Sequence, residues 1–469
     1  MNKLETGLVF AAAAVAGVSC QSTTEERPNI LVILLDDAGY NDFGFMGCPD
    51  LKTPNIDALA ADGVCFTDGH VSASVSGPSR AGILTGRYQQ RVGYECNPEG
   101  GDGLDVGAVT IGDIFQGAGY NTAAFGKWHQ GHGTADQHPN NRGFDYFYGF
   151  NTGSRSYFYR PNTNDKAGSS GNLQINGEQI TFEGYMTDVL AKATCDYLDD
   201  ITAKNDDPFM IYLAFNAVHT PMEATEEDLA LFEGHPRQTL AAMTWAVDRG
   251  IGDVVNKLKE KGIYDNTLIF FLSDNGGAHN NTSRNTPLKG FKGNKFEGGH
   301  RVPFFMTYGK RFSGESYDGL ISSLDIIATS AAAAGIETST LEQPLDGVDI
   351  MPYVTGKSEG EPHDILFWRK EDMAAVRQGD YKLIRVVGVG ERLYNLEENL
   401  GEDNDLSAAM PELKSQMEAS LEAWESELVN PLLWKEGIWN DVTRIIHRDL
   451  MENKPVSCYS PDQMKRLEK

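Results

Sequence analysis

The segment NILVILLDD, residues 29–37, is the feature that most constrains the fold of this chain. Its six consecutive aliphatic residues, Ile30 to Leu35, leave no polar face, so both sides of the strand that they predict must be covered. Strands of this kind lie at the centre of parallel sheets with helices on both faces. The run ends at Asp36 and Asp37, which places two carboxylates at the end of a central strand.

Three further segments repeat this pattern of a short apolar run that leads into polar residues: NTAAFGKWHQG at 121–131, PFMIYLAFNAVHTP at 208–221 and NTLIFFLSDNGG at 266–277. Segments with helical periodicity, such as residues 53–63 and 237–262, separate the predicted strands. This alternation predicts an α/β fold with a parallel sheet. In such sheets ligands bind beyond the carboxyl ends of the strands.

The pattern changes near residue 360, where short strands with turns and one amphipathic helix replace the α/β alternation. We therefore predict a large domain over residues 28–360 and a small α+β subdomain with a tail over residues 361–469. An Asn-Gly pair in INGEQI predicts a hairpin within the loop-rich segment from Asn151 to Gly184. Residues 430–469 match no pattern that assigns them a role.

The first residues predict an export signal. Lys3 precedes an apolar run from Leu8 to Val18 that is too short to span a membrane, and small residues lead to Cys20. We predict a signal peptide over residues 1–19 and a linker over 20–27. AGVSC resembles a lipoprotein box with Cys20 acylated; the alternative is a simple cleaved signal with an incidental cysteine. We expect an exported protein, periplasmic or anchored to the outer membrane.

If Cys20 is acylated, an odd number of cysteines remains and at least one thiol stays unpaired. The remaining cysteines are Cys48, Cys65, Cys96, Cys195 and Cys458. A disulfide framework is therefore not expected to be the main source of stability.

The formal net charge of −27, from 40 Lys and Arg against 67 Asp and Glu, argues against nucleic acid as a partner. It also means that an anionic substrate must be held by a local positive cluster against an unfavourable overall field.

The segment SVSGPSRAGILTG, residues 74–86, predicts a short helix closed by Gly86. Pro78 is favoured at the first position of a helix, which places Ser76 just ahead of an N-terminus that attracts anions, with Arg80 in the first turn. The alternative is a commonplace helix start without a chemical role.

The acids at two strand ends, Asp36 with Asp37 and Asp274 with Asn275, suit a hard divalent cation, Ca²⁺ or Mg²⁺. Buried carboxylates are costly unless a cation or a donor compensates them. Either pair alone is also explained as a helix cap or a loop contact, but two pairs together favour a metal.

Basic residues follow other predicted strands. If the strand geometry persists through GKWHQG, Lys127 and His129 point to one face. His219 lies just past another strand, and Lys292 lies in a Gly-rich loop. Each alone is also typical of a surface group. Together with Arg80 they form the local positive cluster that the net charge requires.

These segments resemble the sulfatase family of the alkaline-phosphatase-like superfamily. The family's signature, serine or cysteine followed by x-P-S-R, matches Ser76 to Arg80, and Leu84 to Arg87 continue it. The other matching segments fall in the family's order: RPNILVILLDD, TPNIDALAADGVCFT, GYNTAAFGKWHQG, RGFDYFYGF, HTP, SDNGG, FKGNKFEGGHRVP, VRQGDYKLI and LYNL. The resemblance extends from about Arg27 to Leu406. It implies a large, mixed and mostly parallel sheet flanked by helices, with a small C-terminal α+β domain.

The resemblance also implies cofactors. In this family the serine or cysteine at the position of Ser76 is oxidised after translation to formylglycine, and a serine implies an anaerobic-type radical maturase as a partner. An unactivated serine would be a poor nucleophile. The implied ligands of Ca²⁺, preferred over Mg²⁺, are Asp36, Asp37, Ser76, Asp274 and Asn275.

The same resemblance implies the catalytic roles. Arg80 orients the hydrated aldehyde, and Lys127 and Lys292 stabilise charge on the sulfate oxygens. His219, with Lys292, protonates the departing alcohol, and His129 removes a proton from the second hydroxyl. The family often has leucine where this chain has Gln130, a departure that the sequence does not explain.

The implied function is hydrolysis of sulfate esters of a carbohydrate of the galactose or N-acetylgalactosamine type. A phosphomonoester or phosphonate hydrolase on the same scaffold is an alternative, because fold does not fix function. A non-catalytic sugar-binding relative is disfavoured by the complete set of motif residues. Expected sugar contacts are His138, Arg142, Arg155, Tyr157, Tyr159 and Arg160, with packing of the tyrosines and solvation of the arginines as alternatives.

Overall fold

The computed structural model describes residues 26–97, 100–431 and 437–467. The predicted signal peptide and Cys20 lie outside these residues. None of the helices within the described ranges is both long and apolar enough to cross a membrane. No disulfide joins any of the five cysteines that are described.

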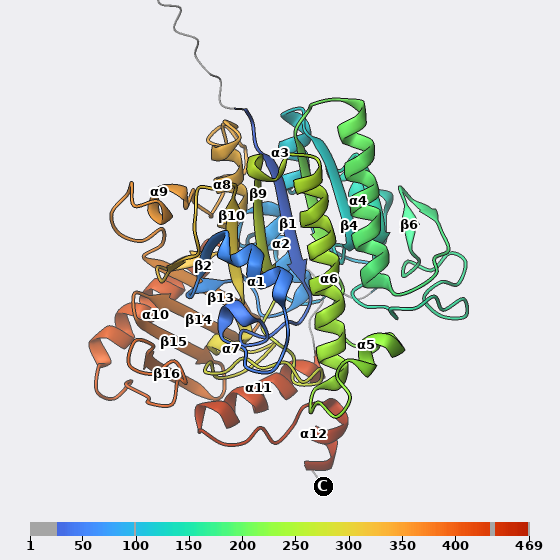
Figure 1. Ribbon diagram of the computed structural model, residues 1–469. Helices are drawn as coiled ribbons and strands as arrows, with labels where there is room; N and C mark the ends of the chain where they lie inside the picture. Colours follow the sequence, from blue (N-terminus) through green and yellow to red (C-terminus); the bar gives the residue numbers. More distant parts are fainter. Residues whose placement is uncertain (1–25, 98–99, 432–436, 468–469) are drawn as a thin grey trace, which may run out of the picture.

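Within those ranges, ten strands form one twisted sheet in the order β11-β2-β10-β9-β1-β8-β4-β5-β6-β7 (Figure 1). Their bounds are β1 (Asn29–Leu35), β2 (Gly63–Phe66), β4 (Asn121–Lys127), β5 (Tyr146–Phe150), β6 (Gln174–Ile175), β7 (Glu178–Gln179), β8 (Phe209–Ala214), β9 (Thr267–Ser273), β10 (Phe304–Tyr308) and β11 (Glu315–Tyr317). β9, β1, β8, β4 and β5 run parallel, and β10 joins antiparallel. The predicted α/β fold with a mixed, mostly parallel sheet is confirmed.

Helices cover both faces of this sheet, as the apolar run in β1 predicted. Leu31, Ile33 and Leu35 pack with α1 (Pro54–Ala61), α4 (Met186–Lys204) and α6 (Gln238–Glu260). The alternate residues of β1 pack on the other face with α2 (Ser76–Thr85), α3 (Ile111–Gly117) and α8 (Asp325–Ala333). Successive side chains of a strand point to opposite faces, so one strand contributes to two cores.

Shorter elements surround this sandwich. They are α5 (Glu226–Ala230), α7 (Glu297–His300), α9 (Met351–Val354) and a two-stranded sheet of β3 (Gly69–His70) and β12 (Ile321–Ser322). The expected hairpin is confirmed, because β6 and β7 pair antiparallel around Asn176 and Gly177. Both turn residues have positive φ, 49° and 90°, the conformation that makes Asn-Gly the favoured pair for such a turn.

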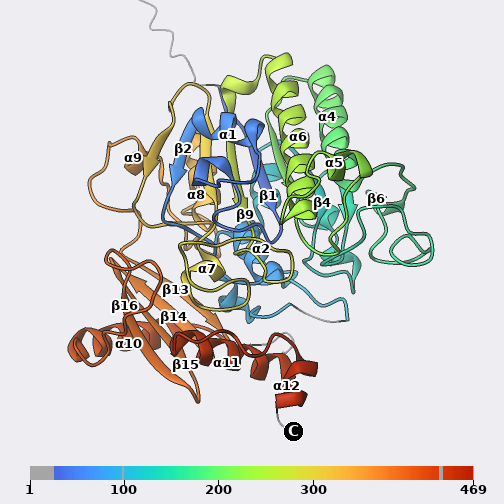
Figure 2. The ribbon, with the colours of Figure 1, turned by 60° about the horizontal axis from the view of Figure 1, so that its bottom comes forward.

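The chain after residue 360 builds a second, antiparallel sheet, seen below the main sheet in Figure 2. Its strands are β13 (Ile365–Lys370), β14 (Met373–Gln378), β15 (Tyr381–Val386) and β16 (Gly390–Asn395), and its helices are α10 (Pro411–Ser426), α11 (Ile438–Met451) and α12 (Pro461–Leu467). The predicted boundary at residues 360 and 361 falls between α9 and β13. The short strands and the amphipathic helix predicted here are confirmed.

Candidate active site

The carboxyl ends of the central parallel strands bring the predicted acids and bases together. Asp36 and Asp37 follow β1, and Asp274 and Asn275 follow β9, its direct neighbour. The Asp37 amide donates to Asp274 Oδ1 at 3.3 Å, which ties the two strand ends to each other. All four side chains are buried.

Ser76 lies against these acids. Its hydroxyl oxygen is 3.2 Å from Asp36 Oδ1 and 3.1 Å from Asn275 Oδ1, two acceptors that one hydroxyl proton cannot satisfy together. The structure corrects the predicted helix start, because α2 begins at Ser76 with Val75 as its N-cap. Gly86 ends the helix in the left-handed conformation, as expected, with φ of 62°.

Three cations surround the carboxylates. Lys127 Nζ donates to Asp36 Oδ2 at 2.6 Å, and Lys292 Nζ lies 2.7 Å from Asp37 Oδ1. Arg80 Nε donates to Asp274 Oδ2 at 2.8 Å. These three members of the predicted positive cluster are therefore together, and each has its shortest ion pair with a different acid.

These cations govern the ionisation of the acids. Burial alone would raise the pKa of Asp36 and Asp37, but the nearby charges outweigh it. Lys127, His219 and Arg80 hold the pKa of Asp36 below its usual value, and Lys292 and His219 do the same for Asp37. Both acids are therefore carboxylates over the physiological pH range.

His219 stands at the open side of this group. Its Nδ1–H donates to the Thr220 carbonyl at 2.6 Å, which leaves Nε2 directed at Asp37 Oδ2, 3.6 Å away. The His219 side chain is 19% exposed to solvent. A histidine with one nitrogen fixed and the other facing the site is suited to proton transfer.

The backbone at His129 is not the extended strand that the sequence predicted. β4 ends at Lys127, and His129 adopts a left-handed φ of 55°, so strand geometry does not extend to it. Burial, and then Lys127 and Arg80, lower its pKa well below the usual value, so the ring is neutral. A Cβ at Gly153 would lie 2.5 Å from His129 Nε2, so a larger residue there would displace the ring.

Gln130, which the sequence left unexplained, is buried and ties two parts of the site together. Its Nε2 donates to the Gly77 carbonyl at 2.9 Å and to the His129 carbonyl at 2.7 Å. The loop after β4 is thereby fixed to the first turn of α2, next to Ser76. A leucine here would lose both hydrogen bonds.

The donor set fits a hard divalent cation. Ligand atoms of Asp36, Asp37 and His219 lie within 4.8 Å of one another. The oxygens of Asp36 and Asn275 converge on the Ser76 hydroxyl, as described above. Carboxylate and amide oxygens of this kind are the ligands that Ca²⁺ and Mg²⁺ prefer.

A comparison with known families decides the assignment. The family model described as Sulfatase matches residues 28–336. The chain belongs to the sulfatase family. This sulfatase is therefore a sulfuric ester hydrolase.

Curated relatives agree. The chain is 31% identical to an uncharacterized sulfatase, YdeN, of Escherichia coli strain K12, over 84% of this chain and 85% of that one. It is 30% identical to the N-acetylgalactosamine-6-sulfatase of Mus musculus, over 76% of this chain and 72% of that one.

Among solved structures, the sulfatase superposes with a TM-score of 0.83 on Ps i-CgsB in complex with k-i-k-neocarrahexaose. The two are 35% identical, over 92% of this chain and 100% of the other.

The expected sugar contacts need correction. Arg142, Arg155 and Tyr157 are buried and bonded inside the protein. Arg142 donates to the carbonyls of Asp105 and Ala108, and Arg155 pairs with Asp165 at 2.9 Å. The Tyr157 hydroxyl lies 2.6 Å from the Asn216 carbonyl and 2.8 Å from that of His219. These three side chains hold loops of the sulfatase in place. Tyr157 holds the loop that carries His219.

The other expected contacts remain accessible. The Arg160 side chain keeps 49% of its exposure and pairs with Glu223 at 3.2 Å. His138 Nε2 lies 3.0 Å from Gln174 Oε1, and His138 lines a pocket of about 490 Å³ together with Asn151. Tyr159 packs edge-on against Phe182, so it has the packing role that was the alternative to contact with a sugar.

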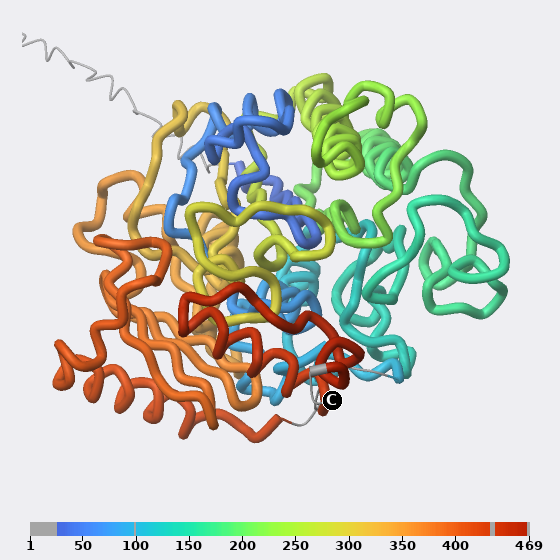
Figure 3. Tube along the Cα trace, turned by 90° about the horizontal axis from the view of Figure 1, so that it is seen from below, coloured from blue at the N-terminus to red at the C-terminus, as the bar shows by residue number. Residues whose placement is uncertain are grey.

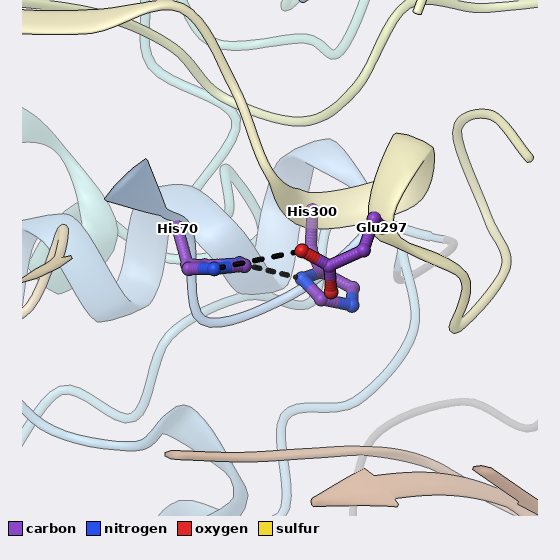
Figure 4. A group of neighbouring side chains, drawn as sticks. All are labelled: His70, Glu297 and His300. Atoms are coloured by element: carbon purple, nitrogen blue, oxygen red, sulfur yellow. Dashed lines mark hydrogen bonds and ion pairs between the residues drawn. The ribbon is translucent and has the colours of Figure 1, made fainter. Parts of the chain in front are cut away.

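A second group of metal-type ligands in the described part of the chain escaped sequence reasoning. His70 of β3 meets Glu297 and His300 of α7 (Figure 4), all fully buried. His70 Nδ1 lies 3.0 Å from His300 Nδ1, and Lys382 Nζ lies 2.8 Å from Glu297 Oε1 and 3.2 Å from His300 Nε2. Lys382 thus supplies a positive charge to Glu297 and to the His300 nitrogen that does not contact His70. Its three members come from two distant segments of the large domain, and Lys382 comes from the second sheet, so no local sequence pattern indicates this group.

Proposed function

We propose that this sulfatase removes sulfate from a sulfated carbohydrate with galactose or N-acetylgalactosamine units. The proposal rests on the convergence of Ser76, the strand-end acids and three cations in one pocket. The bound k-i-k-neocarrahexaose in a structure 35% identical, and the N-acetylgalactosamine-6-sulfatase among the relatives, support this class of substrate.

Asp36, Asp37, Asp274 and Asn275, with residue 76, would hold the divalent cation, Ca²⁺ by the family resemblance. Such an ion supplies Lewis acidity to the nucleophile and to a sulfate oxygen. Oxidation of Ser76 to formylglycine by a radical maturase would supply a hydrate with two hydroxyls, one to attack sulfur and one to release sulfate. Ser76 as it stands contacts Asp36 and Asn275 and no histidine, and a carboxylate with a lowered pKa is a weak base for activating a hydroxyl.

The residues around this centre would have different catalytic roles. Lys127 and Lys292, whose ammonium groups already face carboxylates, would neutralise sulfate oxygens in the transition state. Arg80, held by Asp274, would orient the nucleophile. His219 Nε2 would deliver a proton to the departing sugar oxygen, and the neutral, buried His129 would accept one when sulfate is released.

The charges of the pocket support an anionic substrate. Among the described residues, the carboxylates of Asp36, Asp37 and Asp274 face Arg80, Lys127 and Lys292, so the charges balance. A bound divalent cation would therefore make the pocket net positive within a chain of net charge −27. A sulfate ester carries a single negative charge and suits such a pocket.

We also propose that the protein is exported and, by the lipoprotein-like AGVSC, anchored through Cys20. Mass spectrometry of the mature N-terminus tests this. An unmodified residue downstream of Cys20 would exclude the anchor.

The test of function uses protein co-expressed with an anaerobic-type maturase. We expect sulfate release from k-i-k-neocarrahexaose or from N-acetylgalactosamine 6-sulfate, loss of turnover to background in Ser76→Ala, and loss on chelation that Ca²⁺ reverses. The tryptic peptide with residue 76 should show oxidation. A fully active enzyme with unoxidised Ser76, or turnover untouched by chelators, would exclude the cofactors. Faster turnover of an aryl phosphate or phosphonate than of the matched aryl sulfate would favour the alternative hydrolase.

A further inference from the structure

The C-terminal tail, residues 456–467, reaches the rim of the active site. Figure 3 looks up at the carboxyl ends of the strands and shows this red segment and α11 lying across the yellow loops. His447 of α11 fixes the contact, because its Nε2 accepts a hydrogen bond from the Lys295 amide at 3.0 Å. Burial lowers the pKa of His447 to about 3, so the ring stays neutral and keeps its acceptor.

Two further contacts fix the tail to α11. Asp449 accepts hydrogen bonds from the Ser457 amide at 2.8 Å and from the Ser457 hydroxyl at 2.5 Å. Cys458 is fully buried in an apolar cluster with Ile446 and Met464, and Phe291 packs against that cluster. The backbone on both sides of Tyr459 is thus held before any ligand arrives.

Three aromatic rings meet where this tail touches the active-site loops. The rings of Tyr459 and His279 stack with their centroids 4.6 Å apart and 23° between their planes. Phe291 lies 5.9 Å from Tyr459 and 5.4 Å from His279. His279 is exposed, and Phe291 and Tyr459 are half-buried. We call these three residues the aromatic shelf.

The aromatic shelf adjoins the catalytic residues on two sides. Phe291 directly precedes Lys292, whose Nζ lies 2.7 Å from Asp37. Asn281, two residues beyond His279, donates to the carbonyl of Asp37 at 3.0 Å. Partial burial, and then the charge of Lys292, lower the pKa of His279, in agreement with this proximity. The aromatic shelf therefore belongs to the same loops that carry Lys292 and Asn281 to Asp37.

We propose that the aromatic shelf binds the apolar face of the sugar ring next to the sulfated one in an oligosaccharide. This inference rests on the proposed carbohydrate sulfatase function. Rigid aromatic rings offer a flat surface at low entropic cost, and binding sites combine such surfaces with a few placed polar groups. The Tyr459 hydroxyl donates to none of the described residues and is available to a sugar hydroxyl.

The test compares a large and a small substrate. We expect Tyr459→Ala to lower kcat/KM for k-i-k-neocarrahexaose by about tenfold, the size of one aromatic contact, and to leave kcat/KM for 4-nitrophenyl sulfate within about twofold. Tyr459→Phe keeps the ring and should retain most activity. Trp439→Ala removes an exposed aromatic side chain from α11 outside the shelf, and it should change kcat/KM for neither substrate. If the wild type prefers galactosamine sulfates, a hexasaccharide with N-acetylgalactosamine 6-sulfate replaces the probe.

Each other outcome overturns the inference. An equal loss on both substrates would mean that Tyr459 only supports the Lys292 loop, and no loss on either would mean that the shelf binds nothing. A wild-type enzyme that hydrolyses the aryl sulfate but no sulfated sugar would refute the carbohydrate function itself. That failure is visible before any variant is made.

Discussion

Two buried ionic clusters of this sulfatase contain the same kinds of charge and yet differ in what they can do. The catalytic cluster consists of Asp36, Asp37, Asp274, Arg80, Lys127 and Lys292. The interface cluster, between the two sheets, consists of Asp68, Glu297, Glu402, Arg301, Arg377 and Lys382, with His70 and His300. Both bring metal-type ligands within 4.8 Å of one another.

The difference lies in access and in unmatched acceptors. Lys382 lies 2.8 Å from Glu297 and 3.0 Å from Glu402, and its side chain has no exposed surface. In the catalytic cluster, Lys292 keeps 20% of its side-chain exposure, and two acceptors compete for the one proton of Ser76. The catalytic cluster is therefore distinguished by its open side and by the pair of acceptors at Ser76.

The strongest test of this distinction removes the histidine at the open side. His219→Ala should lower kcat for a sugar sulfate by about 10²–10⁴-fold, the usual scale of a proton-transfer group. The loss should be much smaller for 4-nitrophenyl sulfate, because its phenolate departs without a proton donor. Steady-state kinetics on both substrates measure the contrast.

His235→Ala is the matched control, since His235 has a similar side-chain exposure of 18% and lies 3.8 Å from Asp50. It should leave both rates unchanged. Equal losses for the two leaving groups in His219→Ala would remove His219 as the proton donor.

A substitution in the interface cluster should change the unfolding free energy. Lys382→Met leaves the Glu297 and Glu402 carboxylates buried without their shared cation, which should cost about 3–5 kcal/mol of unfolding free energy. Urea unfolding measures this. Lys310→Met, at a side chain with 89% exposure, should cost less than about 1 kcal/mol.

The same variant decides whether the interface cluster holds a lysine or a metal. With Lys382 as the resident cation, chelators should not reproduce the destabilisation of Lys382→Met. An unchanged unfolding free energy in the variant would contradict the role given to Lys382.

The catalytic cluster was largely predictable from sequence, because its members follow apolar runs whose ends meet at one edge of a parallel sheet. Asp36, Asp274 and Lys127 illustrate this, since each directly follows or ends a recognisable strand. The path of His129 was not predictable, because β4 ends at Lys127 and the backbone turns to a left-handed conformation at His129.

The interface cluster and the aromatic shelf show what sequence patterns miss. His70, Glu297 and Lys382 come from three segments in two domains, and Tyr459 meets His279 across 180 positions of the chain. Such contacts depend on how the domains dock. The sequence also does not show which residues of irregular segments are buried. The loop pattern around Arg155 does not distinguish an exposed arginine from one that pairs with the buried Asp165.

The smallest expected effect concerns Glu402, whose pKa is raised to about 7 by burial and by the neighbouring Glu297, against the opposing charge of Lys382. Because the folded state holds this proton more tightly than the unfolded state, Glu402 should make stability fall as pH rises from about 4.5 to 7. Glu402→Gln, neutral throughout, should remove a decline on the order of 1 kcal/mol, measured as the difference from wild type in thermal unfolding between pH 5 and 8. Glu398→Gln, at an exposed position on the same turn, should follow the wild-type curve. A Glu402→Gln curve parallel to that of the wild type would mean that Lys382 keeps Glu402 ionised in the folded state throughout this pH range.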